Sequence, residues 1–330
     1  MFIIARSLEE ATPGEKWKTR FKKNWPFYRK WFLSEGVKER PGYLSCVENL
    51  GIYMPELLPV YDQLCELVGG GDLESRYLSQ WCPPPYMSGC SQLAWVKDGP
   101  CLIRNYDYGI EFFEGLIFKS NWLKPVIGVS DSSWGLLDGI NGDGLVASLT
   151  FGGRKVVGNG MGIPLIIRYI LETCADVHQA IAVLKRVPVH MAYNVTLIDR
   201  NSEFFTVYLS PDHAPDITNW AVGTNHQHTI EWPDYARISK TVERKSFLDE
   251  CWLDPHQTRQ GLVQKFLTPP VFNTNYKKRF GTLYTGMYDC IEGSLHLYWH
   301  GLDFKQSFEE FKERRDMIMI GSAVSQKIIS

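Results

Sequence analysis

Apolar residues recur at helical spacing through most of the first eighty residues. Between residues 50 and 67 they recur at three- and four-residue intervals, and the glycines at 69–71 end this run. In residues 16–29 basic side chains are interleaved with aromatic ones, which predicts an amphipathic helix with a solvated face rather than a membrane or RNA contact. We therefore expect residues 1–89 to form an N-terminal helical segment.

Residues 82–89, with the sequence Cys-Pro-Pro-Pro-Tyr-Met-Ser-Gly, interrupt this pattern. The three prolines lack amide hydrogens and forbid a helix, so this segment is expected to be an irregular connection. It is the strongest break in the pattern before the strands begin, and we take it as the boundary to a second part, residues 90–330.

Short strand-like runs dominate the second part. Apolar runs separated by turn sequences predict strands at 92–96, 101–108, 145–151, 191–198, 203–209, 220–224, 282–288 and 294–299. Between them, residues 163–187 show helical spacing and predict two consecutive helices, the second capped by Asp176. Strands, then helices, then strands favour an α+β layered protein over a parallel α/β fold.

Composition narrows the class of protein. The 330 residues are 44% hydrophobic, as expected for a chain with a large core, and the net charge of -2 gives no electrostatic footprint for nucleic acid. The start of the chain lacks the long apolar core of a secretory signal, and no uncharged stretch is long enough to span a bilayer. The eight cysteines include no C-x-x-C pair, which favours a reducing, cytoplasmic setting over a disulfide scaffold or a zinc module.

The Gly89–Cys90 junction is the candidate for chemistry. Glycine leaves the carbonyl unhindered and tolerates backbone torsions that other residues avoid, so the Cys90 thiol could attack this peptide bond. An N-to-S acyl shift and hydrolysis would give fragments 1–89 and 90–330. The freed α-amine, with a reference pKa of ~7.7–8.0, could then serve as general base for its own thiol. A glycine–cysteine pair is common, however, and a free cysteine is usually a small buried apolar residue.

The neighbouring sequence adds a family resemblance. Residues 89–92, Gly-Cys-Ser-Gln, followed by 104–108, Arg-Asn-Tyr-Asp-Tyr, resemble the N-terminal-nucleophile hydrolases of the choloylglycine hydrolase and penicillin acyltransferase group. In that family a nucleophilic cysteine opens one strand, and the next strand carries Arg-Asn-x-Asp and an aromatic residue. Residues 138–145 are similar to its Gly-Met-Asn-x-x-Gly-Leu turn, and Thr-Asn-His at 224–226 is similar to its Thr-Asn-His element. With the hairpin at 282–299, the resemblance runs from about residue 40 to the end.

The resemblance implies a four-layer αββα sandwich in which two antiparallel sheets pack face to face. It implies that residues 1–89 become a small subunit that stays bound to the catalytic part, 90–330. The implied reaction is cleavage of a linear amide of an N-acyl compound through a thioester on Cys90, with release of the acyl group to water or to an amine acceptor. No cofactor or metal is implied, and the partners are the N-acyl substrate, with acyl-coenzyme A as an alternative donor, the cleaved fragment and, as an open option, a second copy of the chain.

The resemblance also assigns roles on the strand after Cys90. Asp107 would hold the α-ammonium of Cys90 or orient its amine, because a nearby carboxylate stabilises the charged form. Arg104 would help keep the thiol ionised through its positive field. Without the surrounding motif, the same two residues would be read as a surface salt bridge.

Three further residues are expected around the oxyanion. Asn225 is the candidate donor, because a side-chain amide directed at a developing negative charge stabilises the transition state. Thr150 lies where bile-salt-type members place an asparagine or a tyrosine for the same hole, and this departure leaves the second donor open. Arg244 resembles the late arginine of the family's Ser-x-x-Arg element, with Arg237 as a nearby competitor.

Other readings remain at this stage. His226 and His228 have an alternating spacing that could hold a metal, but the sequence offers no third ligand, so turn histidines are favoured. A thiol protease with a separate histidine base is a second enzyme reading. A third reading is a binding protein that keeps the fold but is never processed.

Overall fold

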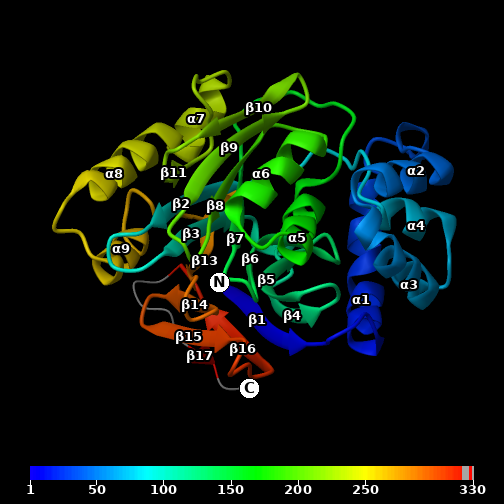
Figure 1. The fold of residues 1–330 in the computed structure, drawn as a ribbon, viewed down its shortest axis with the longest axis horizontal. Coiled ribbons are helices and arrows are strands. Elements are labelled where there is room, and N and C mark those ends of the chain that lie inside the picture. Colours follow the sequence, from blue (N-terminus) through cyan, green and yellow to red (C-terminus); the bar gives the residue numbers. More distant parts are fainter. Residues whose placement is uncertain (322–326, 329–330) are drawn as a thin grey trace.

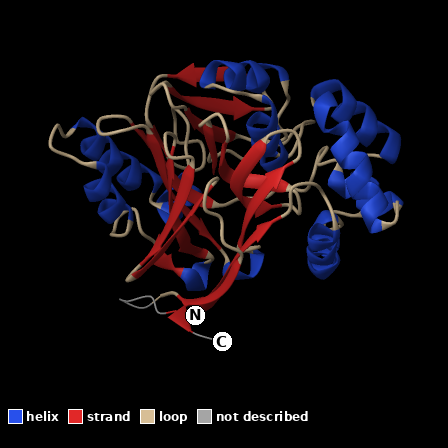
Figure 2. Cartoon of the chain, turned by 60° about the horizontal axis from the view of Figure 1, so that its bottom comes forward, coloured by secondary structure: helices blue, strands red, loops and turns tan. Residues whose placement is uncertain are grey.

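Two β-sheets packed face to face form the centre of the protein (Figures 1 and 2). The computed structural model describes residues 1–321 and the backbone of 327–328, so the other residues of the predicted 90–330 part lie outside it. Within this range one sheet has ten strands, in the order β10-β9-β8-β7-β6-β5-β4-β1-β16-β17. Its strands are β1 (Phe2–Glu9), β4 (Leu116–Asn121), β5 (Pro125–Asp131), β6 (Gly135–Asn141), β7 (Val146–Phe151), β8 (Tyr193–Ile198), β9 (Phe204–Ser210), β10 (His213–Thr218), β16 (Arg314–Met319) and β17 (Lys327–Ile328).

The second sheet has seven strands in the described residues, in the order β11-β2-β3-β13-β14-β15, with β12 paired to β13. Its strands are β2 (Gly89–Trp95), β3 (Cys101–Tyr108), β11 (Val222–Gly223), β12 (Thr274–Asn275), β13 (Phe280–Asp289), β14 (Ser294–Trp299) and β15 (Leu302–Ser307). The strands β2 and β3 form a hairpin in which Cys90 lies opposite Tyr106. This pairing fixes which side chains can meet around Cys90.

Helices cover the outer faces of both sheets, as the flanking blue coils of Figure 2 show. The helices are α1 (Glu15–Phe32), α2 (Tyr43–Tyr53), α3 (Leu58–Val68), α4 (Asp72–Leu78), α5 (Ile163–Thr173), α6 (Val177–Arg186), α7 (Pro233–Ser239), α8 (Thr241–Leu253) and α9 (Arg259–Phe266). The ten-stranded sheet packs against α5, α6 and the N-terminal helices, whereas α8 and α9 pack on the seven-stranded sheet. The predicted α+β class and four-layer αββα sandwich are therefore confirmed.

The space between the sheets is filled by apolar side chains that alternate along the strands. Ala94 and Leu102 of the smaller sheet meet Ile127 and Val146 of the larger one, and all four are fully buried. On the opposite face of β2, Leu93 and its alternate neighbours pack against α8 and α9 instead. This two-sided burial explains why β2 is apolar along most of its length rather than alternating with polar residues.

The N-terminal segment begins with a strand, which the helical prediction missed. Strand β1 lies between β4 and β16, antiparallel to β16 and parallel to β4, while the other neighbouring strands of both sheets pair antiparallel in the described residues. Ile3, Ala5 and Ser7 are buried and the residues between them are more exposed. This two-residue period is that of a strand, but its polar members Arg6 and Ser7 hide it in the sequence.

Most other predicted elements are found with small shifts at their ends. The strand expected at 220–224 shortens to Val222–Gly223, and the run expected at 50–67 is divided by Pro55 into two helices. Asp176 caps α6 as predicted, accepting a hydrogen bond from the Gln179 amide at 2.9 Å. The strands that were not predicted also include β4, β5, β6, β10, β12, β15, β16 and β17.

Helix α1 is amphipathic, as the sequence predicted. It buries Trp17 and Phe21 against the rest of the protein and leaves its lysines outside. In the part of the chain that the structure describes, we find no helix with the length and apolar character needed to cross a bilayer.

Candidate active site around Cys90

Cys90 is the second residue of β2, and its side chain points into the core between the two sheets. The thiol is fully buried. Its Sγ atom lies 3.5 Å from Ser88 Oγ and 3.3 Å from Arg104 Nη2. The predicted pairing of Cys90 with Arg104 is therefore present, because the two side chains lie on the same face of adjacent strands.

Arg104 is a buried cation held by a carboxylate that sequence reasoning did not assign to the site. Its Nη1 atom donates to Asp138 Oδ2 at 2.5 Å and to Ser148 Oγ at 3.1 Å. Tyr284 also donates to Asp138. Burial raises the pKa of the Cys90 thiol, and the charge of Arg104 opposes this rise. Asp138 thus fixes the cation that favours the thiolate.

Gly89 is needed for space rather than for unusual torsions. It lies outside the left-handed region of backbone conformation, contrary to the expectation that its freedom of torsion matters. A Cβ atom at this position would lie 3.0 Å from Asp107 Cβ and 3.1 Å from Phe280 Cδ1. A larger residue at this position would push the Asp107 side chain away from the Gly89–Cys90 bond.

Asn225 contacts the chain on both sides of the Gly89–Cys90 bond. Its Oδ1 atom accepts a hydrogen bond from the Cys90 amide at 2.9 Å. Its Nδ2 atom donates to the carbonyls of Ser88, at 3.3 Å, and Phe151, at 3.2 Å. The predicted oxyanion donor therefore lies at the junction, with its amide hydrogens already engaged in the intact chain.

Arg244 completes this network, and its competitor does not. The guanidinium of Arg244 donates to the Cys90 carbonyl at 2.6 Å, to Ser91 Oγ at 2.7 Å and to Asn225 Oδ1 at 2.7 Å. Arg237 is instead exposed and pairs with Asp234. The structure thus brings Arg244 to Cys90 and leaves Arg237 outside the site.

Asp107 lies beside the junction but does not touch the Cys90 amide. Its Oδ1 atom accepts a hydrogen bond from Thr282 Oγ1 at 2.6 Å. Its Oδ2 atom is buried without a hydrogen bond in the described residues, 3.5 Å from Arg244 Nη1. Burial raises the pKa of the Asp107 carboxyl to about 6, although Arg244 and Thr282 stabilise its charged form.

Thr150 is not directed at the thiol. Its hydroxyl donates to the Thr224 carbonyl at 2.8 Å and accepts a hydrogen bond from Asn194 Nδ2 at 3.2 Å. The side chain therefore braces the segment that carries Asn225, and the position that sequence reasoning left open is not filled by this hydroxyl.

Tyr235 supplies a donor that sequence reasoning missed. Its hydroxyl donates to the Ser88 carbonyl at 2.7 Å, the same oxygen that Asn225 Nδ2 contacts. Burial raises the pKa of Tyr235 well above its usual value, so the hydroxyl keeps its hydrogen at neutral pH. The Tyr235 hydroxyl and the Asn225 amide thus both donate to the Ser88 carbonyl, close to Cys90. No local sequence pattern predicts this arrangement.

Comparison with known proteins assigns the chain to a family. Residues 95–303, well over half of the chain, match the family of acyl-coenzyme A:6-aminopenicillanic acid acyl-transferase. The chain belongs to this acyltransferase family. The matched span includes Arg104, Asp107, Asn225 and Arg244 but begins after Cys90. The predicted family resemblance is confirmed.

Solved structures also match the chain, at low sequence identity. They include penicillin V acylase from Agrobacterium tumefaciens, which is 13% identical with a TM-score of 0.45 and covers 69% of this chain and 90% of that one. A mutant of the conjugated bile acid hydrolase from Clostridium perfringens is 11% identical, with a TM-score of 0.47 and coverage of 73% and 97%. The Caenorhabditis elegans ortholog of N-acylethanolamine-hydrolyzing acid amidase is 15% identical, with a TM-score of 0.45 and coverage of 61% and 92%. No curated protein sequence matches the chain.

In this member of the acyltransferase family, a cavity of about 500 Å³ lies beside the junction. Met87 lines it, and so does Tyr235, whose hydroxyl contacts the Ser88 carbonyl two residues before Cys90. Its other lining residues are mostly aromatic and include Phe27, Trp31, Tyr108, Phe112, Trp232 and Phe280.

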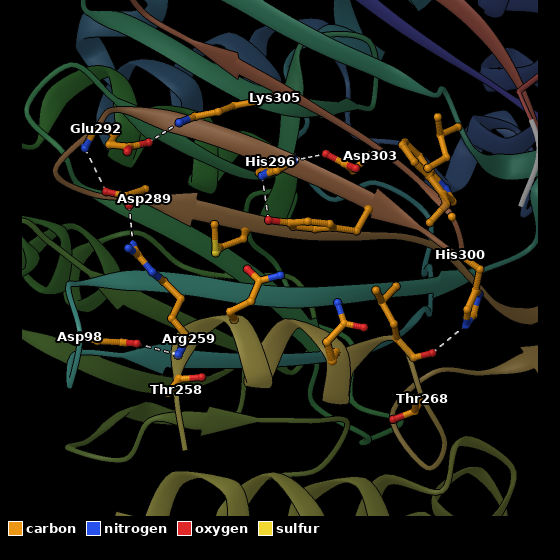
Figure 3. A pocket seen from close by; sticks show the side chains of 18 residues that line it. Asp98, Thr258, Arg259, Thr268, Asp289, Glu292, His296, His300, Asp303 and Lys305 are labelled. Atoms are coloured by element: carbon orange, nitrogen blue, oxygen red, sulfur yellow. Dashed lines mark hydrogen bonds and ion pairs between the residues drawn. The ribbon is translucent and has the colours of Figure 1, made fainter. Parts of the chain in front are cut away.

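A larger cavity of about 710 Å³ lies elsewhere, between α9 and the strands β14 and β15 (Figure 3). Its charged groups pair with one another: Arg259 contacts Asp289, and His296 lies between Asp303 and Tyr298. None of the predicted site residues lines it. It is therefore not the site that the family motifs form.

The histidines do not form the alternative sites considered from the sequence. His226 Nδ1 contacts Thr241 Oγ1 at 2.8 Å, and His228 pairs with Asp216. Among the described residues we find no cluster able to hold a metal ion. The polar contacts of the Cys90 thiol in this range are with Ser88 and Arg104, so no histidine is placed as its base.

Asp107 should titrate near pH 6 in the uncleaved protein. Because this pKa lies above that of an unfolded aspartate, the folded state loses stability from this group as the pH rises from about 4 to about 6. Thr282→Val should raise the pKa of Asp107 further, because the Thr282 hydroxyl bonds the charged form. Carboxyl-carbon NMR on the Cys90→Ala chain, with and without Thr282→Val, measures the pKa of Asp107 and its change.

Thr285→Val is the matched control, because that hydroxyl donates to Asn105 and not to Asp107. A pKa of about 4 for Asp107, or equal shifts in the two variants, would contradict the described environment.

Proposed function

We propose that this chain is a self-processing cysteine amidohydrolase that cleaves the linear amide bond of an N-acyl compound through a thioester on Cys90. The observation that carries the proposal is the set of contacts at the Gly89–Cys90 bond. The thiol lies 3.3 Å from a buried guanidinium, and Asn225 contacts the Cys90 amide and the Ser88 carbonyl at once. Family membership supports the acyl-transfer chemistry.

The first reaction is cleavage of the chain itself. The Cys90 thiolate attacks the Gly89 carbonyl carbon, and the carbon–nitrogen bond breaks as the amide nitrogen takes up a proton. The acyl group of Gly89 then rests on sulfur as a thioester. Water hydrolyses this thioester, which gives the Gly89 carboxylate, the free thiol and a new amino terminus at Cys90.

Cleavage supplies Asp107 with a second partner beside Arg244, the new α-ammonium of Cys90. The space next to Asp107 is occupied by Gly89 in the intact chain, and Asp107 Oδ2 lacks a hydrogen bond in the described residues. The new α-ammonium would remain on Asn225 Oδ1, which already accepts from this nitrogen. With Gly89 gone, the ammonium can also reach Asp107 Oδ2, which has Arg244 as an ion-pair partner but no hydrogen bond, and this is the role that sequence reasoning gave to Asp107.

Cleavage also frees two donors for the oxyanion. When Ser88 leaves, the Asn225 amide and the Tyr235 hydroxyl both lose the carbonyl that they hold. They are then available for the carbonyl oxygen of an incoming amide. We therefore propose Tyr235, rather than Thr150, as the second oxyanion donor.

Turnover then follows the same chemistry on a small molecule. The thiolate attacks the amide carbonyl of the substrate while the α-amine of Cys90 holds the thiol proton. That proton passes to the leaving nitrogen, the amine departs, and the acyl group remains as a thioester. Water releases it as a carboxylic acid.

Transfer of the acyl group to an amine is the second candidate reaction. The description of the family favours it, because an acyltransferase delivers the same thioester to an amine acceptor, with acyl-coenzyme A as donor in place of an amide.

The eight cysteines are all unpaired thiols, which supports our proposal that the protein works in a reducing, cytoplasmic compartment.

The protein should release amines from a panel of N-acyl amides, and Cys90→Ala should abolish this release. Mass spectrometry of the stalled reaction should find the acyl group on Cys90, since the thioester forms there. Cys65→Ala serves as the control, because that thiol lies in α3, outside the site. Amide turnover by the Cys90→Ala chain would refute the proposal.

Tyr235→Phe should lower kcat by roughly 10- to 100-fold with little change in KM, because the lost hydrogen bond acts mainly on the transition state. Tyr61→Phe is the matched control: its buried hydroxyl also donates to a backbone carbonyl, that of Ser75, in the helical segment. Steady-state kinetics of the processed enzymes separate the two. Equal kcat values for Tyr235→Phe and the unaltered protein would exclude Tyr235 from the oxyanion hole.

A further inference from the structure

The aromatic cavity beside Cys90 contains one carboxylate with little compensation. Asp131 ends β5, in the wall of the cavity formed largely by aromatic rings. Its Oδ1 atom accepts hydrogen bonds from the Ser132 amide at 2.8 Å and from the Tyr28 hydroxyl at 3.2 Å. Both bonds are to this one oxygen, and Oδ2 has no hydrogen bond or ion pair in the part of the chain that the structure describes.

The bond from Tyr28 compensates Asp131 weakly. The hydroxyl of Tyr28 has a single hydrogen, and its closest acceptor is Glu114 rather than Asp131. Glu114 itself is paired with Arg20 at 2.6 Å. Burial, and then the charge of Glu114, raise the pKa of Asp131 to about 7. Asp131 therefore lacks the cation that its neighbour has.

The other charged residues of the cavity do not neutralise Asp131. Asp234 pairs with Arg237 at 2.9 Å, and Arg279 pairs with Glu111 at 2.6 Å. Lys278 is exposed at the rim. In the cavity of Figure 3, Arg259 pairs with Asp289, and His296 pairs with Asp303. The aromatic cavity thus offers a ligand a carboxylate that has no ion pair among the described residues.

A carboxylate surrounded by ring faces matches one ligand chemistry. An ammonium group bonds the carboxylate and is attracted to the negative faces of aromatic rings, which also bury its apolar carbon atoms. A ligand carboxylate would be repelled by Asp131, and a purely apolar ligand would remove water from this half-buried charge without pairing it. The cavity volume of about 500 Å³ is within the range of sites for small molecules.

We propose that the aromatic cavity binds an ammonium group joined to an aromatic or aliphatic part of the substrate, with Asp131 as its counter-ion. The assignment of this ligand as part of the amide substrate rests on the function proposed above. The binding site itself does not, because it is lined by residues present in the intact chain. Asp131 is thereby the residue that selects cationic over neutral N-acyl amides.

Binding to the Cys90→Ala chain tests the site without catalysis. Phenethylammonium, phenethyl alcohol and phenylacetate differ in charge at similar size, and Trp31 and Trp232 in the cavity wall report binding by fluorescence. We expect the ammonium to bind roughly tenfold or more tightly than the alcohol, and phenylacetate to bind most weakly. Equal affinities for the three probes would overturn the proposal.

Two variants locate the charge that matters. Asp131→Asn should remove the preference for the ammonium over the alcohol, whereas Asp234→Asn, the same change at the exposed rim, should keep it. Binding of the neutral alcohol reports whether the cavity of each variant is intact. A preference that survives Asp131→Asn, or is lost in Asp234→Asn, would also overturn the proposal.

Turnover separates this inference from the proposed function. If the processed protein cleaves neutral amides as readily as their ammonium-bearing counterparts, the amidase function stands and the selection by Asp131 is wrong. If it cleaves no amide but the Cys90→Ala chain still prefers phenethylammonium, the cavity is a cation site and the proposed function is wrong.

Discussion

The side chain of Asn225 holds together the parts of the protein that meet at the Gly89–Cys90 bond. Its oxygen accepts hydrogen bonds from the Cys90 amide and from Arg244, and its nitrogen donates to the carbonyls of Ser88 and Phe151. Through these four bonds it links β2 to α8 and to the last residue of β7 in the opposite sheet. The buried amide can keep all four only while both sheets and the helix layer stay in place.

The charged side chains around this amide are buried, and their burial lowers the stability that they contribute to the fold. Arg104, Arg244, Asp107 and Asp138 are all almost fully buried, and a buried ion pair costs about as much in desolvation as it regains by attraction. The cost is tolerable at Asp138, which accepts bonds from Arg104 and two tyrosines. At Asp107 the cost is offset less fully, because one carboxylate oxygen has no hydrogen bond in the described residues and lies 3.5 Å from Arg244 Nη1.

The layered fold and the β2–β3 hairpin could be predicted because they depend on local alternation and turn chemistry. Cys90, Arg104 and Asp107 were identified from the family resemblance, and the register of the hairpin places Arg104 on the face of Cys90 and Asp107 opposite Gly89. Arg244 and Arg237 could not be separated, because both belong to helical sequence and only packing buries one of them. Tyr235 was missed because its contact with Ser88 joins residues far apart in the chain. The strand β1 was missed because its polar residues obscure a short two-residue period.

The central claim is that the thiol of Cys90 cuts the chain before it, and the intact mass of the purified protein tests this most directly. The account predicts two fragments, 1–89 and 90–330, with Cys90 as the new amino terminus, and a single uncut chain for Cys90→Ala. Because β1 is bonded on both edges within the larger sheet, the two fragments should separate only on denaturation. A wild-type protein that stays uncut while it cleaves amides, or a Cys90→Ala chain that is still cut at this bond, would contradict the account.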